Sequence, residues 1–197
     1  MLTTRRMRRL QVGPIDLELA LGTCVSITGP SGAGKSVLLR MIADLDPHEG
    51  DAMLDGVACS TMPAPQWRRQ VTYVAAESGW WLPSVGEHFP NDADFGHLLP
   101  RLGIPVEAAS WPVARLSTGE RQRLALLRAI ARAPRVLLLD EPTSGLDTDS
   151  VARVESLLLD QLAHGVGILM VTHDPAQAAR IGTRHMRLAD GRLEVVA

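Results

Sequence analysis

Hydrophobic and polar positions follow two kinds of pattern along this chain of 197 residues. Residues 15–21 alternate between apolar and polar positions, which predicts a strand with one solvated face. The run at 136–139 is entirely apolar and is typical of a parallel strand buried on both faces. Further strands are predicted at 24–28, 52–54, 71–74 and 168–172.

Segments with helical periodicity lie between these predicted strands. Residues 149–164 place four aliphatic side chains on one stripe. Ser117 and Glu120 form an S-x-x-E capping box at the start of a helix that runs to about residue 133. Because strands alternate with helices, we predict an α/β fold with a mostly parallel central sheet covered on both faces. Shorter helices are predicted at 37–43, from Trp67 onward and at 176–181, before a terminal hairpin at Asp190-Gly191.

The stretch from Glu77 to Arg115 has a weaker period. Five prolines interrupt it, and short helices are predicted at 93–102 and 106–109. Because it retains several aromatic residues, we predict that 77–115 is a small inserted helical subdomain within a single domain spanning residues 1–197. Its aromatic side chains either mark a partner surface or, as is more frequent, are buried against the main domain.

Charge and composition narrow the class of protein. A formal net charge of −2 disfavours a nucleic-acid binder. Cys24 and Cys59 match no metal-binding spacing, so a reduced cytosolic setting is predicted. No apolar run approaches the ~20 residues that cross a bilayer, and no signal-peptide core follows the basic start. The basic residues 5–9 are either a tether to an acidic surface or, as is more frequent, an exposed edge strand with solvated arginines.

The chain is organised around a glycine-rich stretch that fits G-x-x-x-x-G-K-[ST] and lies between a predicted strand and a predicted helix. Its glycines let backbone amides approach a phosphate, next to the positive end of the following helix dipole. The lysine adds a charge for the β- and γ-phosphates, and the serine hydroxyl can ligate Mg²⁺. The predicted nucleotide-binding residues are Gly29, Pro30, Ser31, Gly32, Ala33, Gly34, Lys35 and Ser36.

Three residues at strand ends complete the predicted phosphate site. Asp140 ends the apolar run at 136–139 and is placed to hold the Mg²⁺ shell. Glu141 follows at once, and its carboxylate can orient or deprotonate the attacking water. His173 ends the next buried strand, so we expect it to share the carboxyl rim of the sheet with Asp140 and Lys35. The predicted catalytic residues are therefore Glu141, His173 and Lys35.

Taken in order, these motifs resemble those of the ATP-binding subunits of ABC transporters, of the short bacterial type, over nearly the whole chain. Residues 116–123 are similar to the family's LSGGQ signature, 140–143 to its Walker B end, 144–147 to its D-loop and 172–174 to its switch histidine. The resemblance implies a P-loop NTPase of the ABC type with N-terminal antiparallel strands, and a head-to-tail homodimer with two ATP molecules at the interface. It implies that each nucleotide meets the other copy's Ser117, Gly119, Glu120 and Asp147.

Three positions depart from the family pattern. Thr118 stands where the family has its first signature glycine. Residues 1–21 contain no aromatic residue to stack on adenine, so an arginine or Met7 is expected to cover the base with weak selectivity. The Q-loop glutamine is missing in register, and Glu77 either replaces it one residue late as a ligand of Mg²⁺ or has no role.

We therefore expect an ATP-hydrolysing subunit that uses ATP and Mg²⁺, dimerises on ATP and drives a separate transmembrane permease. It would lie in the cytoplasm at the inner face of the membrane, with 77–115 as its docking surface and no nucleic acid as partner. Two alternatives stay open. One is a soluble ABC-type ATPase in a non-transport assembly, and the other is a nucleotide-responsive module with little turnover, which Thr118 and Ala76 motivate.

Overall fold

Two sheets form the framework of the computed structural model, which describes residues 1–90 and 95–196. The smaller sheet is antiparallel, in the order β2-β1-β4-β5. Its strands are β1 (Leu2–Arg9), β2 (Val12–Leu19), β4 (Glu49–Leu54) and β5 (Val57–Ala58). The larger sheet has the order β10-β9-β3-β8-β7-β6, and its neighbouring strands are parallel except β9 and β10. Its strands are β3 (Cys24–Thr28), β6 (Val71–Val74), β7 (Val136–Asp140), β8 (Gly167–Val171), β9 (Arg184–Ala189) and β10 (Arg192–Val195). The predicted mostly parallel sheet is confirmed.

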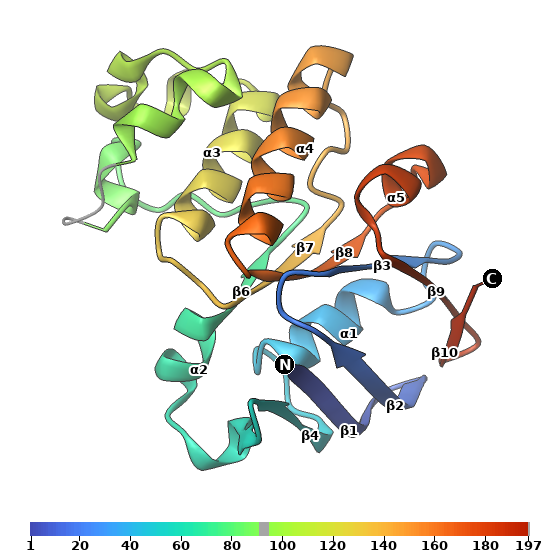
Figure 1. The fold of residues 1–197 in the computed structure, drawn as a ribbon. Coiled ribbons are helices and arrows are strands. Elements are labelled where there is room, and N and C mark those ends of the chain that lie inside the picture. The colour runs from blue at the N-terminus through green and yellow to red at the C-terminus, as the bar shows by residue number, and fades with distance from the viewer. Residues whose placement is uncertain (91–94, 197) are drawn as a thin grey trace.

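Helices cover both faces of the larger sheet (Figure 1). On one face lie α1 (Lys35–Ile42) and the smaller sheet, and on the other lie α3 (Thr118–Ile130) and α4 (Thr148–Ala163). Successive side chains of β7 enter the two cores in turn, because a strand alternates its faces. Leu138 packs in the core beside α1, whereas Leu137 and Leu139 pack in the core beside α3 and α4. Two shorter helices, α2 (Ala64–Gln70) and α5 (Pro175–Ile181), complete the described elements.

Strand register brings the predicted phosphate-site segments to one edge of the larger sheet. Strand β8 lies between β3 and β7, and Val171 is level with both Ile27 and Asp140. The glycine-rich loop after β3, the acids at the end of β7 and His173 after β8 therefore leave the sheet at the same level. Carboxyl ends of parallel strands are the usual place for a ligand in such folds.

Strand β1 corrects the expectation of an exposed edge strand. It pairs with both β2 and β4, so it lies inside the smaller sheet. A register shift between Thr4 and Met7, with Arg6 in the left-handed region at φ 49°, changes which face the later residues occupy. Met7 is consequently fully buried, so it cannot cover a nucleotide base, whereas Arg5, Arg6 and Arg8 are exposed.

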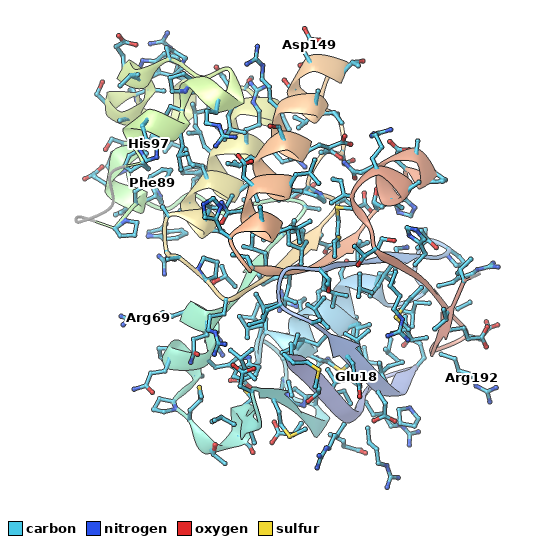
Figure 2. The ribbon with its side chains drawn as sticks, in the orientation of Figure 1. Glu18, Arg69, Phe89, His97, Asp149 and Arg192 are labelled. Atoms are coloured by element: carbon cyan, nitrogen blue, oxygen red, sulfur yellow. The ribbon has the colours of Figure 1, made fainter. Side chains whose placement is uncertain are left out.

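Between β6 and α3 the described residues form short 3₁₀ helices at Gly86–His88, Gly96–Leu98, Pro100–Leu102, Val106–Ser110 and Val113–Arg115. The helix predicted at 93–102 begins at Ala93, outside the described residues, and the rest of it is two 3₁₀ turns. Proline explains the short turns, because each one removes an amide donor from the helix ladder. Phe89, which is labelled in Figure 2, is buried. Its ring stacks on that of Phe95, with the two ring centroids 3.8 Å apart. Trp81 remains 66% exposed. That this segment is a separate subdomain stays a prediction.

Both cysteines are buried thiols. Burial raises the pKa of Cys24 to about 12, and burial also raises the pKa of Cys59 to about 12. Within residues 1–90 and 95–196, no helix is both long enough and apolar enough to cross a membrane.

Candidate functional site

The glycine-rich loop joins β3 to α1, as the sequence predicted. Gly34 precedes the first helical residue with φ 95°, a conformation that favours glycine. A Cβ at Gly34 would come within 2.1 Å of Cγ2 of Val12, and one at Gly29 within 2.1 Å of the carbonyl oxygen of Leu188. The two glycines thus allow the loop to press against β2 and β9. Gly32 also has a positive φ, but nothing lies within 4 Å of the place its Cβ would take.

Lys35 is the single lysine of the chain and begins α1. Its Nζ donates to the carbonyl oxygens of Gly29 at 2.8 Å and Pro30 at 2.9 Å, and the residue is 6% exposed. The ammonium therefore lies inside the loop, beside the amide-rich start of a helix, where an anion is favoured. Ser36, the next residue, is exposed.

Asp140 ends β7 and is 5% exposed. Its Oδ2 accepts a hydrogen bond of 2.9 Å from the hydroxyl of Tyr73 on β6. Burial, followed by the negative charge of Asp140, raises the pKa of Tyr73, so its hydroxyl keeps its proton and remains a donor. Sequence reasoning missed Tyr73. Its position in the strand that pairs with β7 was the available signal.

Glu141 and His173 meet at the rim of the sheet. His173 Nε2 lies 2.7 Å from Glu141 Oε1, and the two side chains are 52% and 28% exposed, respectively. Glu141 has φ 50°, which is an uncommon backbone conformation for a residue with a side chain. The structure thus brings together two residues that the sequence predicted separately.

The signature segment starts α3. The side-chain and backbone hydrogen bonds of the capping box between Ser117 and Glu120 are both present, and Ser117 and Thr118 are exposed. Hydrogen bonds from Ser117 to Oε2 of Glu120, at 2.7 and 2.8 Å, lower the pKa of that carboxyl. The start of the helix is therefore both capped and open to a second molecule.

Gly119 and Asp147 join this helix to the following loop. A Cβ at Gly119 would lie 3.2 Å from Cδ2 of Leu146. Asp147 caps α4 by accepting from the amide of Ser150 at 2.9 Å and from its hydroxyl at 2.8 Å. These hydrogen bonds lower the pKa of Asp147. Roles of Gly119, Glu120 and Asp147 toward a nucleotide stay predictions.

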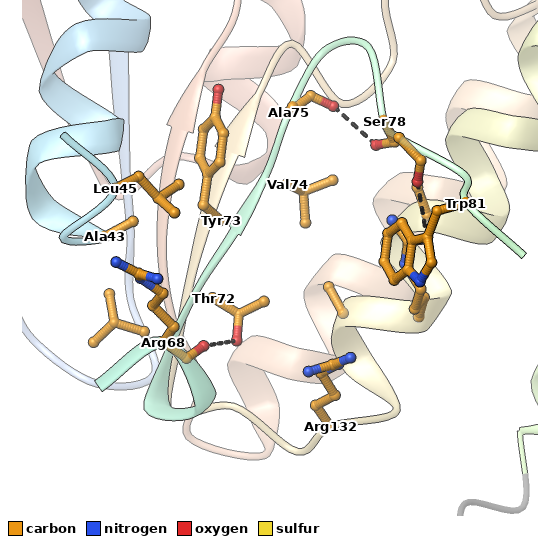
Figure 3. Close-up of a pocket in the computed structure, with 15 residues that line it drawn as sticks. Ala43, Leu45, Arg68, Thr72, Tyr73, Val74, Ala75, Ser78, Trp81 and Arg132 are labelled. Carbon is orange, nitrogen blue, oxygen red and sulfur yellow. Dashed lines mark hydrogen bonds between the residues drawn. The ribbon is translucent and has the colours of Figure 1, made fainter. Parts of the chain in front are cut away.

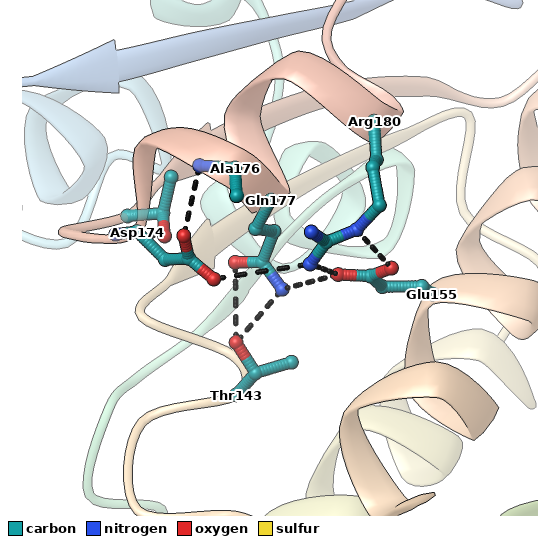
Figure 4. A network of polar contacts seen from close by, with 7 residues as sticks. Thr143, Glu155, Asp174, Ala176, Gln177 and Arg180 are labelled. Carbon is teal, nitrogen blue, oxygen red and sulfur yellow. Dashed lines mark hydrogen bonds and ion pairs between the residues drawn. The ribbon is translucent and has the colours of Figure 1, made fainter. Parts of the chain in front are cut away.

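A network of polar side chains joins the turn that contains Thr143 to helices α4 and α5 (Figure 4). Gln177 is fully buried, and its Nε2 donates to Thr143 Oγ1 at 2.8 Å and to Glu155 Oε1 at 3.3 Å. Arg180 forms a bidentate pair with Glu155 at 2.7 and 2.9 Å. Thr143 follows Glu141 by two residues, and Gln177 lies on the helix after His173. The network therefore links the segments that follow Glu141 and His173.

A cavity of about 290 Å³ lies between β6, the loop that follows it and α3 (Figure 3). We call it the β6–α3 groove. Arg68, Arg128, Arg132 and Trp81 are among its lining residues, and none of the described lining residues is acidic. The guanidinium of Arg128 lies 4.9 Å from the centroid of the Trp81 ring, and burial lowers the pKa of Arg128.

Glu77 lies beyond β6 in the loop that borders this groove and is exposed. The described part of the chain holds no cluster of three or more His, Cys, Asp or Glu side chains placed for a metal ion. This finding leaves the predicted Mg²⁺ ligands Ser36, Asp140 and Glu77 open, because Mg²⁺ commonly takes one or two protein ligands and completes its shell with phosphates and water.

Comparisons with known proteins agree with this geometry. A family model described as "ABC transporter" matches residues 12–144. The aliphatic sulfonates import ATP-binding protein SsuB of Ralstonia nicotianae is 38% identical over 192 residues, which are 93% of this chain and 66% of that relative. Its counterpart in Pseudomonas entomophila is 35% identical over 196 residues, covering 90% and 67%. The chain thus spans about two thirds of the length of these curated relatives.

Solved structures match the fold. A bacterial ABC exporter with ATP bound superposes with a TM-score of 0.86 and 25% identity, over 98% of this chain and 37% of that chain. A dimeric, post-hydrolysis ATP-binding cassette bound to ADP and phosphate has a TM-score of 0.82 and 24% identity, over 100% and 99%. The motifs, the sheet order and these matches show that the chain belongs to the ABC transporter family, as an ATP-binding subunit with the ABC ATPase fold.

Proposed function

We propose that this chain hydrolyses Mg²⁺-ATP between two copies of itself and thereby drives a separate transmembrane permease. The observation that carries the proposal is the 2.7 Å contact between Glu141 Oε1 and His173 Nε2, at the sheet edge where Lys35 lies in the phosphate loop. A carboxylate held by an imidazole at this edge can take a proton from water and remain oriented while it does so.

The loop from Gly29 to Ser36 binds the nucleotide in this proposal. Its backbone amides and the start of α1 attract phosphate oxygens. Lys35 exchanges its two carbonyl acceptors for the β- and γ-phosphates, so no charge needs to be moved in from solvent.

The donor set near this loop fits Mg²⁺. Ser36 offers a hydroxyl and Asp140 a carboxylate, both hard oxygen ligands. The hydrogen bond from Tyr73 to Oδ2 would hold the Asp140 carboxylate in place as it binds the ion. When bound, Mg²⁺ would neutralise charge on the phosphate oxygens. Glu77 stays a predicted third ligand.

Hydrolysis requires an in-line water beside the γ-phosphate. Glu141 orients this water and accepts its proton, while His173 holds the Glu141 carboxylate and contacts the γ-phosphate. The pair lies partly open to solvent, which leaves room for a second copy of the chain to cover it.

The second copy would supply the other half of the site. Ser117, Gly119 and Glu120 lie at an exposed, capped helix start, where first-turn amides outside the capping box have no acceptor within the helix and can donate to a partner's γ-phosphate. Asp147 lies at the cap of α4, in the loop whose Leu146 adjoins Gly119. We therefore place the dimer interface across these two helix starts.

The permease would dock on the β6–α3 groove and the adjoining segment 77–115, which places the chain in the cytoplasm at the inner face of the membrane. Arg68, Arg128 and Arg132 suit an acidic cytoplasmic segment. Reversing the charge at Arg132 (Arg132→Glu) should reduce recovery of the permease in a pull-down. The matched change Arg192→Glu on β10 (Figure 2) should not reduce it. Relatives are named for aliphatic sulfonates import, but the permease rather than this chain would choose the substrate.

The deciding experiment measures ATP hydrolysis by the full chain, by Glu141→Gln and by the control Glu18→Gln on the exposed face of β2 (Figure 2). We expect Glu141→Gln to lose about 10²-fold or more in kcat with ATP binding intact, and Glu18→Gln to match the parent. Lys35→Ala should lose ATP binding itself. Equal rates for Glu141→Gln and the parent would refute the catalytic assignment. ATP binding without turnover in both the parent and Glu141→Gln would instead favour a nucleotide-responsive module.

A further inference from the structure

The backbone of Glu141 is held from two sides in a conformation that it would rarely adopt alone. Its φ of 50° lies in the left-handed region, and such residues persist only when their surroundings fix them. Its amide donates to the carbonyl oxygen of Val171 at 3.0 Å. Its carbonyl oxygen accepts from Nε2 of Gln122 at 2.8 Å and from the amide of Ser144 at 3.2 Å.

Gln122 is the one of these three partners that holds Glu141 through a side chain. It lies on α3, is 8% exposed and is separated from Glu141 by 19 positions in the chain. A carbonyl oxygen only accepts hydrogen bonds, so the amide nitrogen of Gln122 must face it. The bond therefore fixes the orientation of the whole Gln122 amide.

We propose that Gln122 is a positioning residue for ATP hydrolysis, which aims the Glu141 carboxylate by holding the carbonyl group of the same residue. This inference rests on the proposed function, in which Glu141 accepts the proton of the attacking water. Rotation of the Glu141 peptide would swing the side chain away from His173 Nε2, which now lies 2.7 Å from it.

The same bond links two parts of the site that act on different nucleotides. Helix α3 begins at Thr118 and is capped by Ser117, which in the proposed dimer meets the nucleotide of the other copy, and Gln122 lies about one helical turn beyond Thr118. Through this hydrogen bond, a displacement of α3 would move the carbonyl group of Glu141, whose carboxylate acts on the copy's own nucleotide in the proposed dimer. The link needs no intermediate residue.

A buried glutamine can also serve stability alone, because an unpaired buried carbonyl is costly. The kinetic signature separates the two roles. A positioning residue lowers kcat and leaves the KM for ATP unchanged, whereas general loosening of the fold lowers ATP affinity as well. Its effect also disappears once the carboxylate it positions has been removed.

The test uses Gln122→Met in the full chain, because methionine keeps the length of the side chain and removes the donor. Gln161→Met on α4 is the matched control, since Gln161 is also a helical glutamine, is half-buried and lies outside the proposed site. We expect Gln122→Met to lower kcat roughly 10- to 100-fold, as for a misplaced catalytic group. The KM for ATP should stay within about two-fold of the parent, by the argument for interactions made only in the transition state. Gln161→Met should match the parent.

The double variant Gln122→Met with Glu141→Gln completes the cycle. Its residual rate should equal that of Glu141→Gln alone. Parental kcat in Gln122→Met, or the same fold-loss in both backgrounds, would overturn the inference. If Glu141→Gln itself kept full activity, the proposed function would fail separately.

A crystal structure of Gln122→Met decides the positional claim without any rate. We expect Glu141 to leave the left-handed region and its contact with His173 to lengthen. An unchanged Glu141 in that structure would overturn the inference.

Discussion

Ser117 offers the most discriminating test of the proposed interface, because its capping role and its proposed role toward a partner's nucleotide can be separated. Its hydroxyl accepts from the amide of Glu120 at 3.3 Å and donates to Oε2 of Glu120 at 2.7 Å. Asparagine offers both an acceptor and a donor and caps helices as well as serine does. Aspartate keeps the acceptor but adds a negative charge at an exposed helix start.

The expected magnitude follows from that charge. A carboxylate about 4 Å from a phosphate charge, at an effective dielectric constant of about 20, costs about 4 kcal/mol. The proposed dimer holds two such sites, so the repulsion totals about 8 kcal/mol, which corresponds to roughly a 10⁶-fold loss in the association constant of the two copies. The same substitution destabilises the fold of a single copy much less. Repulsion between the new carboxylate and Glu120 is a surface effect of about 0.5 kcal/mol.

Light scattering with saturating ATP measures the association. All proteins compared also carry Glu141→Gln, so that ATP hydrolysis does not dissociate the dimer. We expect Ser117→Asn to dimerise like the parent and Ser117→Asp to stay monomeric at protein concentrations where the parent is fully dimeric. Thermal unfolding of both variants, and ATP binding to the monomers, serve as controls and should change little. ATP-driven dimerisation of Ser117→Asp at the parental concentration would refute the two-copy site.

Three further predictions concern the phosphate loop, the core and the capping box. Gly34→Ala should abolish ATP binding, because the new Cβ would lie 2.1 Å from Cγ2 of Val12 at φ 95°; isothermal titration measures this, and parental affinity would contradict it. Trp67→Phe should lower the free energy of unfolding, measured in urea, by about 1–3 kcal/mol. The fully buried indole donates to the carbonyl oxygen of Ile42 at 2.8 Å, and phenylalanine leaves that oxygen without a donor. Because Ser117 lowers the pKa of Glu120 below its ordinary value of 4.5, the ionised carboxylate stabilises the fold above that pH and loses this effect as the pH falls through the lowered pKa. Glu120→Gln should therefore lower the Tm at pH 7 but change it less near pH 3, and an equal change at both pH values would count against this reasoning.

Local patterns allowed most of the candidate site to be predicted. The phosphate loop is contiguous, so its spacing alone indicates its chemistry, and the capping box between Ser117 and Glu120 spans a single turn of helix. Asp140 could be predicted at the sheet edge because an all-apolar run ends there. In each case the residues that interact lie within a few positions of one another.

Contacts that depend on tertiary register could not be predicted in this way. Tyr73 reaches Asp140 across 67 positions and Gln122 reaches Glu141 across 19, and neither pair has a sequence spacing that distinguishes it. The prediction that Met7 could cover the nucleotide base was wrong for the same kind of reason. One irregularity in β1 reverses which side of the strand faces the core, so a residue expected at the nucleotide lies in the interior instead.

Lys35 is the single lysine of this sequence, so its ε-amine can serve as a chemical reporter. An amine-directed acylating reagent finds its one ε-amine target of this sequence at Lys35, whose ammonium donates hydrogen bonds to two carbonyl groups of its own loop. Mass spectrometry of the peptide that contains residue 35 would then give a footprint of nucleotide occupancy in a mixture as complex as a native membrane extract, without any engineered label.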